Sequence, residues 1–240
     1  QLWAPDAAYK NGTYYLYFPA KDRGGIFRIG VARSDKPYGP FKAEPEPIAG
    51  SLSMDPAVFV DDDGSAYMYF GGLWGGQLEQ WRTGSYDPDG RIPSVADPAL
   101  GPKFARMSED MLQFDGPVSE IQIVDDNGNP IKSGDKYRWF FEAAWMHKYK
   151  KTYYLSYSTG PTHQIVYATS KNPEGPFTYR GVLLDPVTGW TTHHSTVKYQ
   201  GKWYLFYHDS SLSKGKTHLR CMKYAVMKHN ADGTISLTIK

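Results

Sequence analysis

The sequence has little of several features that would assign it to other protein classes. It holds one cysteine, Cys221, in 240 residues, which excludes an intrachain disulfide framework and a zinc site made from several cysteines. No apolar run approaches the roughly 18 residues that a membrane-spanning helix needs, so no membrane partner is expected. The formal net charge is +2, from 27 basic and 25 acidic residues, and this balance gives no electrostatic reason to expect a nucleic acid partner.

Aromatic residues are abundant and indicate a β-rich core. The chain contains 19 Tyr, 11 Phe and 7 Trp, too many for a disordered chain. Short alternating apolar runs follow tight turns such as Asn11-Gly12 and Asp63-Gly64, which is the pattern of a β-hairpin. These runs occupy residues 14–18, 66–70, 153–157 and 203–207. The sequence therefore predicts an all-β fold.

The four hairpins are copies of one repeat that align without gaps. Their starts lie at Trp3, Asp55, Glu142 and Thr192. A second unit, 31–41, recurs at 167–177 and has the Pro/Gly turn expected between the third and fourth strands of a sheet. A repeat of about 50 residues with about four strands predicts a β-propeller with four blade starts, and residues 88–138 would be outer strands and a long loop. A β-sandwich whose hairpins are similar by coincidence is the alternative.

Two carboxylates, Asp55 and Glu142, occupy the same repeat position on different blades. The innermost strand of each blade begins near the central channel, so both side chains are expected to face one cavity. Apolar and aromatic neighbours raise the pKa of a carboxyl. Two carboxyl groups in different environments are what acid–base cleavage of a glycosidic bond requires. The alternative is that each carboxylate binds backbone N–H groups at a strand end and has a structural role.

Four motifs in order along the chain resemble glycoside hydrolase family 43. They are Trp3-Ala-Pro-Asp6, the segment 54–64 that begins Met54-Asp55-Pro, Glu142-Ala-Ala-Trp145 and the segment that begins Thr192-His-His-Ser. The resemblance implies a five-bladed β-propeller that inverts configuration at arabinose or xylose linkages. It also implies roles: Glu142 as the general acid, Asp55 as the carboxylate that tunes and orients that acid, and Trp3 as an aromatic of the sugar subsite.

One departure from the family concerns the general base. In the family this base is an Asp that opens the first blade, before the Trp3-Ala-Pro-Asp6 motif. Because four blade starts are visible and five are implied, residues 1–240 are expected to be a single propeller catalytic domain that lacks its N-terminal blade and the base. Asp6 is a poor substitute on this reasoning, since strand alternation puts it on the face opposite to Trp3.

Four further residues are candidates for the site. Trp74, in the glycine-rich segment 71–76, is expected to face a sugar or simply to turn the chain, and Trp145 beside Glu142 is a further candidate for sugar binding. Arg220 stands where the family tends to have an arginine that reaches the terminal sugar; a surface arginine is the alternative. His194 is expected to face the propeller axis, where the family often carries calcium. Since calcium prefers oxygen ligands, one imidazole is a weak indication, and no cofactor is expected for the chemistry.

The sequence thus predicts a hydrolase of arabinoxylan, arabinan or xylo-oligosaccharides. A propeller that binds sugar without catalysis would have the same aromatic funnel and is the alternative from another functional class. Arabinofuranosidase and xylosidase activity, and exo and endo action, differ in loops at the funnel mouth and are left open here.

Overall fold

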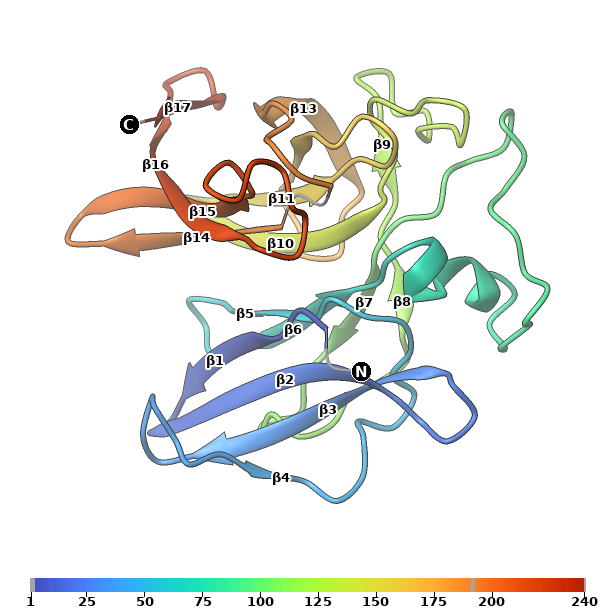
Figure 1. Cartoon of the computed structure of the whole chain (residues 1–240), viewed down its shortest axis with the longest axis vertical. Helices are drawn as coiled ribbons and strands as arrows, with labels where there is room; N and C mark the ends of the chain where they lie inside the picture. Colours follow the sequence, from blue (N-terminus) through green and yellow to red (C-terminus); the bar gives the residue numbers. More distant parts are fainter. Residues whose placement is uncertain (1–2, 191–192, 240) are drawn as a thin grey trace.

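A computed structural model of the chain describes residues 3–190 and 193–239. These residues form four sheets arranged as the blades of a β-propeller (Figure 1). The first contains β1 (Asp6–Lys10), β2 (Thr13–Lys21), β3 (Phe27–Ser34) and β4 (Lys42–Ala43). The second contains β5 (Ala57–Val60), β6 (Ala66–Phe70), β7 (Lys103–Arg106) and β8 (Ser119–Glu120).

The other two sheets come from the C-terminal half of the chain. The third contains β9 (Ile123–Val124), β10 (Glu142–Tyr149), β11 (Thr152–Ser158), β12 (Ile165–Ser170) and β13 (Phe177–Leu184). The fourth contains β14 (His194–Tyr199), β15 (Lys202–Asp209), β16 (Cys221–His229) and β17 (Ile235–Ile239). Two short 3₁₀ helices, η1 (Trp74–Gly76) and η2 (Leu78–Trp81), follow β6. None of the helices in the described ranges is long and apolar enough to cross a membrane.

The first strand of each predicted hairpin is the innermost strand of its blade, as the repeat predicts. β1 contacts β5, β5 contacts β10, and β10 contacts β14. The predicted hairpins are present: β1 pairs with β2 around Asn11 and Gly12, which both have positive φ (51° and 83°). Such a turn matches the twist of the flanking strands, and Asn and Gly adopt it at low cost. The start at Thr192 lies outside the described residues.

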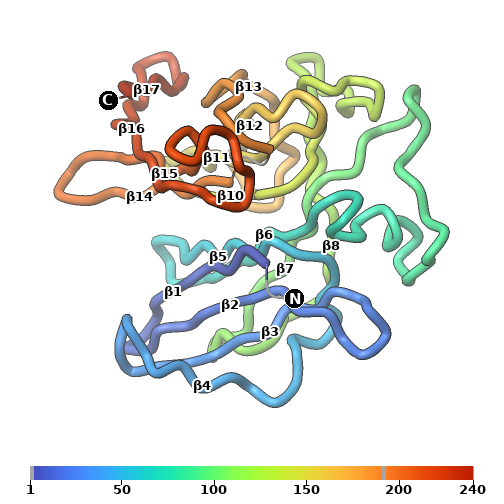
Figure 2. The backbone as a smooth tube through the Cα atoms, in the orientation of Figure 1, coloured from blue at the N-terminus to red at the C-terminus, as the bar shows by residue number. Residues whose placement is uncertain are grey.

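The long interval between the repeat starts at Asp55 and Glu142 contains more than the outer strands of a single blade. After η2 the chain makes an excursion outside the sheets before it returns to β7 (Figure 2). Strand β9 then joins the third sheet parallel to β13, so this sheet has five strands and the other three have four. The repeat did not predict this added strand, because β9 precedes the hairpin of its own blade in the sequence.

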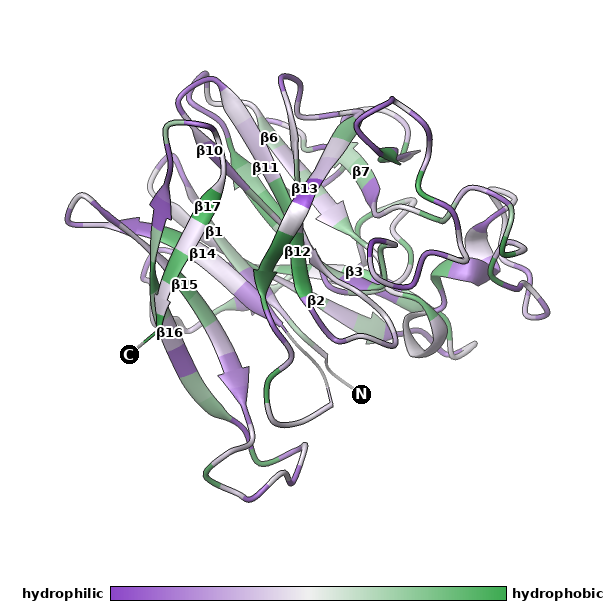
Figure 3. Cartoon of the chain, turned by 90° about the horizontal axis from the view of Figure 1, so that it is seen from above, coloured by the Kyte–Doolittle hydropathy of each residue, from purple (hydrophilic) through white to green (hydrophobic). Residues whose placement is uncertain are grey.

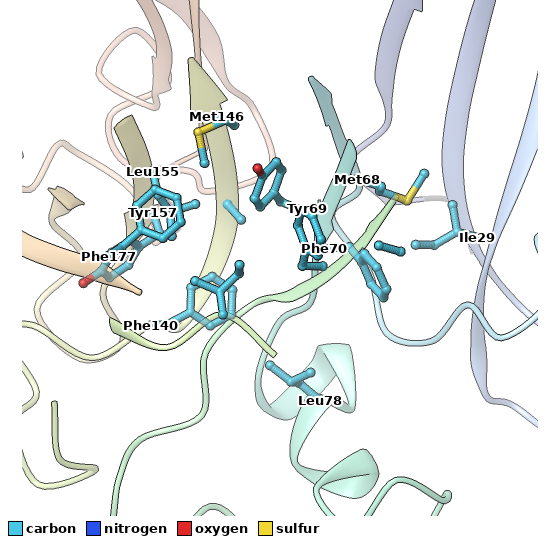
Figure 4. Packing of buried hydrophobic residues seen from close by; sticks show 14 of the residues in the cluster. Ile29, Met68, Tyr69, Phe70, Leu78, Phe140, Met146, Leu155, Tyr157 and Phe177 are labelled. Atoms are coloured by element: carbon cyan, nitrogen blue, oxygen red, sulfur yellow. The ribbon is translucent and has the colours of Figure 1, made fainter. Parts of the chain in front are cut away.

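The core lies between neighbouring sheets, and aromatic residues are the largest of its fully buried side chains (Figure 4). Tyr17, Tyr69 and Tyr157, on the second strands of three of the hairpins, are fully buried. Each phenol donates a hydrogen bond to a backbone carbonyl, at 2.9, 2.7 and 2.6 Å. A buried hydroxyl without a hydrogen-bond partner is costly, so these bonds allow tyrosine side chains to be buried in the core. Hydrophobic residues run along β10, β11 and β12 at the centre of the molecule (Figure 3).

The fourth sheet has one buried face and one largely apolar face that is partly exposed. Along β15 and β16, Leu205 and Ala225 are fully buried, whereas Phe206 is partly exposed and Tyr224 exposed. The alternation on β2 is similar: Tyr15 and Tyr17 are buried, and Leu16 and Phe18 are partly exposed. Both faces border the same cavity, because Leu16 and Phe206 line it together. The ring of blades is therefore open between the first and fourth sheets among the residues that the structure describes.

Candidate active site

A cavity of about 570 Å³ opens where the blades meet. It is lined by residues from all four blades and their connecting loops, among them five of the predicted site residues. These five are Trp3, Asp55, Trp74, Glu142 and Arg220. Asp55 and Glu142 share one cavity, as their common repeat position predicts.

Glu142 is the first residue of β10, and its placement depends on an irregular backbone. The β10–β11 register shifts between Glu142 and Trp145, and Ala143 has a positive φ of 60°. A bulge of this kind re-aims a side chain at the end of a strand. The glycine-rich segment 71–76 also holds the start of β10 in place, because Leu73 N–H donates a hydrogen bond of 2.9 Å to the Phe141 carbonyl. A Cβ on Gly72 would clash with Met54 Cε and lie 3.3 Å from Glu142 Cβ, so the close approach of this segment to both side chains depends on glycine here.

Asp55 is held against the backbone beside Glu142. Its own φ is 54°, and its Oδ2 accepts a hydrogen bond of 3.2 Å from Ala143 N–H. The same oxygen lies 3.0 Å from His193 Nε2. Asp55 is thus both a structural acceptor, as the alternative interpretation predicted, and a charged neighbour of the second carboxyl.

The environment favours a protonated Glu142. The pKa of Glu142 is raised to about 7, first by burial and then by the nearby Asp55 charge, against the opposing effects of His193 and Arg220. Only 8% of Glu142 and 4% of Asp55 is exposed. A carboxyl whose pKa lies near neutral pH can donate a proton under ordinary conditions.

His193 is a site residue that the sequence analysis missed. Asp55 raises the pKa of His193 against the opposing effect of burial. Its backbone N–H donates to His208 Nε2 at 3.3 Å. Burial lowers the pKa of His208 to about 4, so this ring is neutral and can accept that bond. The sequence contains both His193 and His194, but alternation from Thr192 predicted that only His194 faces the propeller axis.

Three tryptophans give the cavity its aromatic wall. Trp3 packs on Phe27 with ring centroids 5.0 Å apart. Trp74 packs edge-on against Phe141 at 5.0 Å. Trp190, which the sequence analysis did not select, also lines the cavity. Its only sequence signal was its position just before the fourth repeat.

A second cavity of about 460 Å³ continues from the first and contains the remaining predicted residues. Pro5, Asp55, His193 and Arg220 line both cavities. Trp145 and His194 line only the second one. Trp145 Nε1 donates to Thr196 Oγ1 at 3.0 Å and so links β10 to β14. Trp145 is therefore separated from the aromatic wall of the first cavity.

Asp6, which alternation was expected to place on the face opposite to Trp3, does not line the first cavity with Trp3 and Glu142. Asp6 lines the second cavity together with Asp55. Strand β1 begins at Asp6, so Trp3 precedes the strand and the alternation rule does not relate the two residues. Asp6 Oδ2 accepts a hydrogen bond of 2.7 Å from Val58 N–H. Burial raises the pKa of Asp6 to about 7.

His194 has one free ligand position for a metal. Its Nε2 is 2.6 Å from Ser156 Oγ, and its buried Nδ1 has no hydrogen-bond partner among the described residues. Burial lowers the pKa of His194 to about 3, which keeps the imidazole neutral. No group of three or more His, Cys, Asp or Glu side chains that could hold a metal occurs in residues 3–190 and 193–239. The residues therefore fit a calcium ion only as one ligand of an ion otherwise held by water.

Known proteins have the same sequence pattern and fold. The family model for glycosyl hydrolases family 43 matches residues 1–235. Xylosidase/arabinosidase 43A of Humicola insolens is 59% identical over 242 residues, covering 98% of this chain and 74% of that protein. The β-xylosidase of Xylanibacter ruminicola is 51% identical, covering 100% of this chain and 75% of that protein.

A solved structure extends the similarity to three dimensions. A β-xylosidase/α-arabinofuranosidase from a compost metagenome, crystallised with xylotriose in a calcium-free form, superposes with a TM-score of 0.97. It is 68% identical, and the match covers 99% of this chain and 73% of that one. On the family match over nearly its whole length and these relatives, the chain belongs to glycosyl hydrolases family 43.

Proposed function

We propose that this glycoside hydrolase inverts configuration while it releases xylosyl or arabinosyl units from xylo-oligosaccharides and arabinoxylan. The single observation that carries the proposal is the carboxyl pair: Glu142 has a pKa of about 7 and shares an aromatic cavity with Asp55. The substrate class is supported by relatives named xylosidase/arabinosidase, β-xylosidase and arabinoxylan arabinofuranohydrolase.

In the mechanism, Glu142 protonates the glycosidic oxygen as the bond to the anomeric carbon breaks. A base-activated water attacks that carbon from the opposite side, which inverts its configuration. Asp55 keeps the proton on Glu142 by its charge and holds the β10 start through Ala143 N–H. Arg220 has several N–H donors in a fixed plane and would bind the hydroxyls of the sugar.

We infer that the open faces of the first and fourth sheets are covered by a further sheet in the active enzyme, and that this sheet supplies the base. The support is the row of partly exposed apolar residues on each face, including Leu16, Phe18, Phe206 and Tyr224. A sheet normally buries such a face against another layer. The 240 residues described above would then be four blades of one catalytic propeller.

The 240-residue chain alone is therefore expected to bind xylo-oligosaccharides but to hydrolyse them slowly. Loss of one acid–base group typically costs about 10²–10⁴-fold in rate. Release of nitrophenol from nitrophenyl xyloside and arabinofuranoside measures this, with the full-length enzyme as the reference.

A rate equal to that of the full-length enzyme would show that the base lies within these residues. Asp6 would then be the first candidate, because it lines the second cavity and its pKa is raised to about 7. In that case Asp6→Asn is expected to abolish the activity of the chain. A chain that binds xylo-oligosaccharides in every form but never hydrolyses them would support the non-catalytic alternative.

His194 is the residue that we propose as a ligand of a structural calcium ion at the propeller axis. The unpartnered Nδ1 supports this, and a related structure described as calcium-free indicates that the ion is relevant to such proteins. Calcium is expected to raise the Tm of the wild-type protein relative to EDTA, because an ion that binds only the folded state stabilises it. His194→Ala should remove this calcium-dependent increase. An equal increase in wild type and variant would exclude His194 as the ligand.

A further inference from the structure

Asp61 is a buried carboxylate that lines neither cavity and has no part in the mechanism above. It directly follows β5 and is 8% exposed. Its Oδ1 accepts hydrogen bonds of 2.5 Å from Lys148 Nζ and 2.7 Å from Asp62 N–H, and its Oδ2 accepts one of 2.5 Å from the Tyr153 hydroxyl. A buried charge needs partners of this kind, and these three donors hold the carboxylate at one position between two blades.

The ion pair between Asp61 and Lys148 joins the second blade to the third. Lys148 and Tyr153 lie directly opposite each other in the β10–β11 hairpin. Asp61 lies in the tight turn after β5, where its N–H donates to the Ser65 carbonyl at 2.8 Å. Burial would raise the pKa of Asp61, but the hydrogen bonds from Lys148 and Tyr153 lower it below its usual value, so the pair is ionised at neutral pH.

The same two strands carry the carboxyl pair of the active site at their other ends. Asp61 is the sixth residue after Asp55, and Lys148 is the sixth residue after Glu142. At about 3.3 Å per residue, the ion pair lies about 20 Å from the site, so neither partner can reach a sugar bound beside Glu142. Strands β5 and β10 contact each other but belong to different sheets, so no ladder of backbone hydrogen bonds fixes one against the other (Figure 1).

The contact between the two strand starts is weaker than the ion pair. Asp55 Oδ2 accepts a hydrogen bond of 3.2 Å from Ala143 N–H, and both residues have positive φ. The β10–β11 register also shifts in this region. The ion pair has two charged partners at a shorter distance, so it is the stronger of these two connections between the strands.

We propose that Asp61 and Lys148 are positioning residues for the reaction. Their ion pair holds β5 and β10 in register along their length and so sets the distance between the two carboxyl groups of the site. This inference rests on the proposed function, in which Asp55 keeps the proton on Glu142. Without the ion pair the strand starts can slide, and repulsion between the Asp55 and Glu142 charges favours a larger separation.

Three charged groups face Glu142, and the ion pair acts mainly on one of them. These groups are Asp55, His193 and Arg220. His193 and Arg220 directly precede β14 and β16 of the fourth blade, which the ion pair does not contact. Loss of the ion pair should therefore reach Glu142 chiefly through Asp55. A separation larger by about 1 Å would lower the pKa of Glu142 by about 0.5.

The test uses the double variant Asp61→Asn/Lys148→Met, which removes both charges together and leaves neither one buried without its partner. Both changes are needed because Asp62 Oδ2 also lies 3.1 Å from Lys148 Nζ. The pKa of Glu142 is measured by ¹³C NMR on protein labelled at the glutamate carboxyl carbons, and Glu142→Gln assigns the signal. The double variant is expected to lower this pKa by about 0.5 and to move the basic limb of kcat/KM to lower pH by the same amount.

Lys103→Met/Glu120→Gln is the matched control. Lys103 Nζ lies 2.6 Å from Glu120 Oε2 and Lys103 is 9% exposed, but this pair joins β7 and β8 within the second blade. A change in Tm reports the loss of an ion pair and is expected in both double variants. A change in the pKa of Glu142 is expected only when the pair between the blades is removed.

The outcomes distinguish this inference from the proposed function. An unchanged or raised Glu142 pKa, or an equal fall in both double variants, would overturn the positioning role. When Asp55→Asn is already present, removal of the ion pair should lower the pKa no further, and an undiminished fall would also overturn it. The NMR measurement needs no turnover. A selective fall in a protein that never hydrolyses xylo-oligosaccharides would therefore support the positioning role and contradict the proposed function.

Discussion

Glu142→Gln in the hydrolytically active enzyme is expected to slow the hydrolysis of natural xylo-oligosaccharides by at least about 10²–10⁴-fold. The amide has nearly the shape of the carboxyl group but has no acidic proton to transfer to the leaving oxygen. A sugar alkoxide is a poor leaving group and needs that proton, whereas a nitrophenolate departs with little help. The same variant should therefore retain much more of its activity on nitrophenyl glycosides. Initial rates on xylobiose and on nitrophenyl xyloside measure the difference.

Glu79→Gln provides the matched control for this experiment. Glu79 is also buried, and burial also raises its pKa, but it lies outside the cavity and binds the backbone of Trp74. Because the amide oxygen of Gln can still accept the hydrogen bond from Trp74 N–H, this replacement should keep Trp74 in place and affect natural and activated substrates to the same degree. Equal losses on both substrates in Glu142→Gln would mean that Glu142 is not the proton donor, although the fold assignment would stand.

The repeat in the sequence predicted the blades well because hairpins depend on local signals. Tight turns and alternating aromatic residues specify strand pairing over a few residues, and all four hairpins are present in the structure. The common repeat position also brought Asp55 and Glu142 together correctly, since equivalent strand starts meet at the axis of a propeller. Strand β9 was missed because its pairing with β13 is non-local and only two residues long.

The rest of the site depends on departures from regular strands. Asp55 and Ala143 both have positive φ values, so the side chains at the strand starts do not follow simple alternation. The same rule does not relate Asp6 to Trp3, because β1 begins only at Asp6, and it overlooked His193. Trp190 lies in a loop, where no periodic pattern relates a residue to the cavity. Such residues become recognisable only when the neighbouring blades are in place.

Asp55→Asn is expected to move the basic limb of the pH–rate profile to lower pH. The Asp55 charge is one of two effects that raise the pKa of Glu142, after burial. Without that charge Glu142 loses its proton at a lower pH, and the fraction of enzyme with a protonated acid at neutral pH falls. The amide oxygen of Asn can still accept the hydrogen bond from Ala143 N–H, so the strand start should keep its position. Measurement of kcat/KM for xylobiose between about pH 5 and 9 would locate the basic limb of the profile.

The pKa of His193 also changes in Asp55→Asn, and this change affects the pKa of Glu142 in turn. Asp55 raises the pKa of His193, so Asp55→Asn also makes that ring less charged, and a less charged His193 lowers the Glu142 pKa less strongly. The two effects oppose each other, but Asp55 has the larger direct influence on Glu142 and should determine the sign. In His193→Gln, which removes only the positive charge, the basic limb should move to higher pH. Opposite shifts in the two variants would establish that both groups act through the proton on Glu142. A basic limb that stays in place or moves to higher pH in Asp55→Asn would mean that Asp55 is an anchor for the backbone and does not tune the acid.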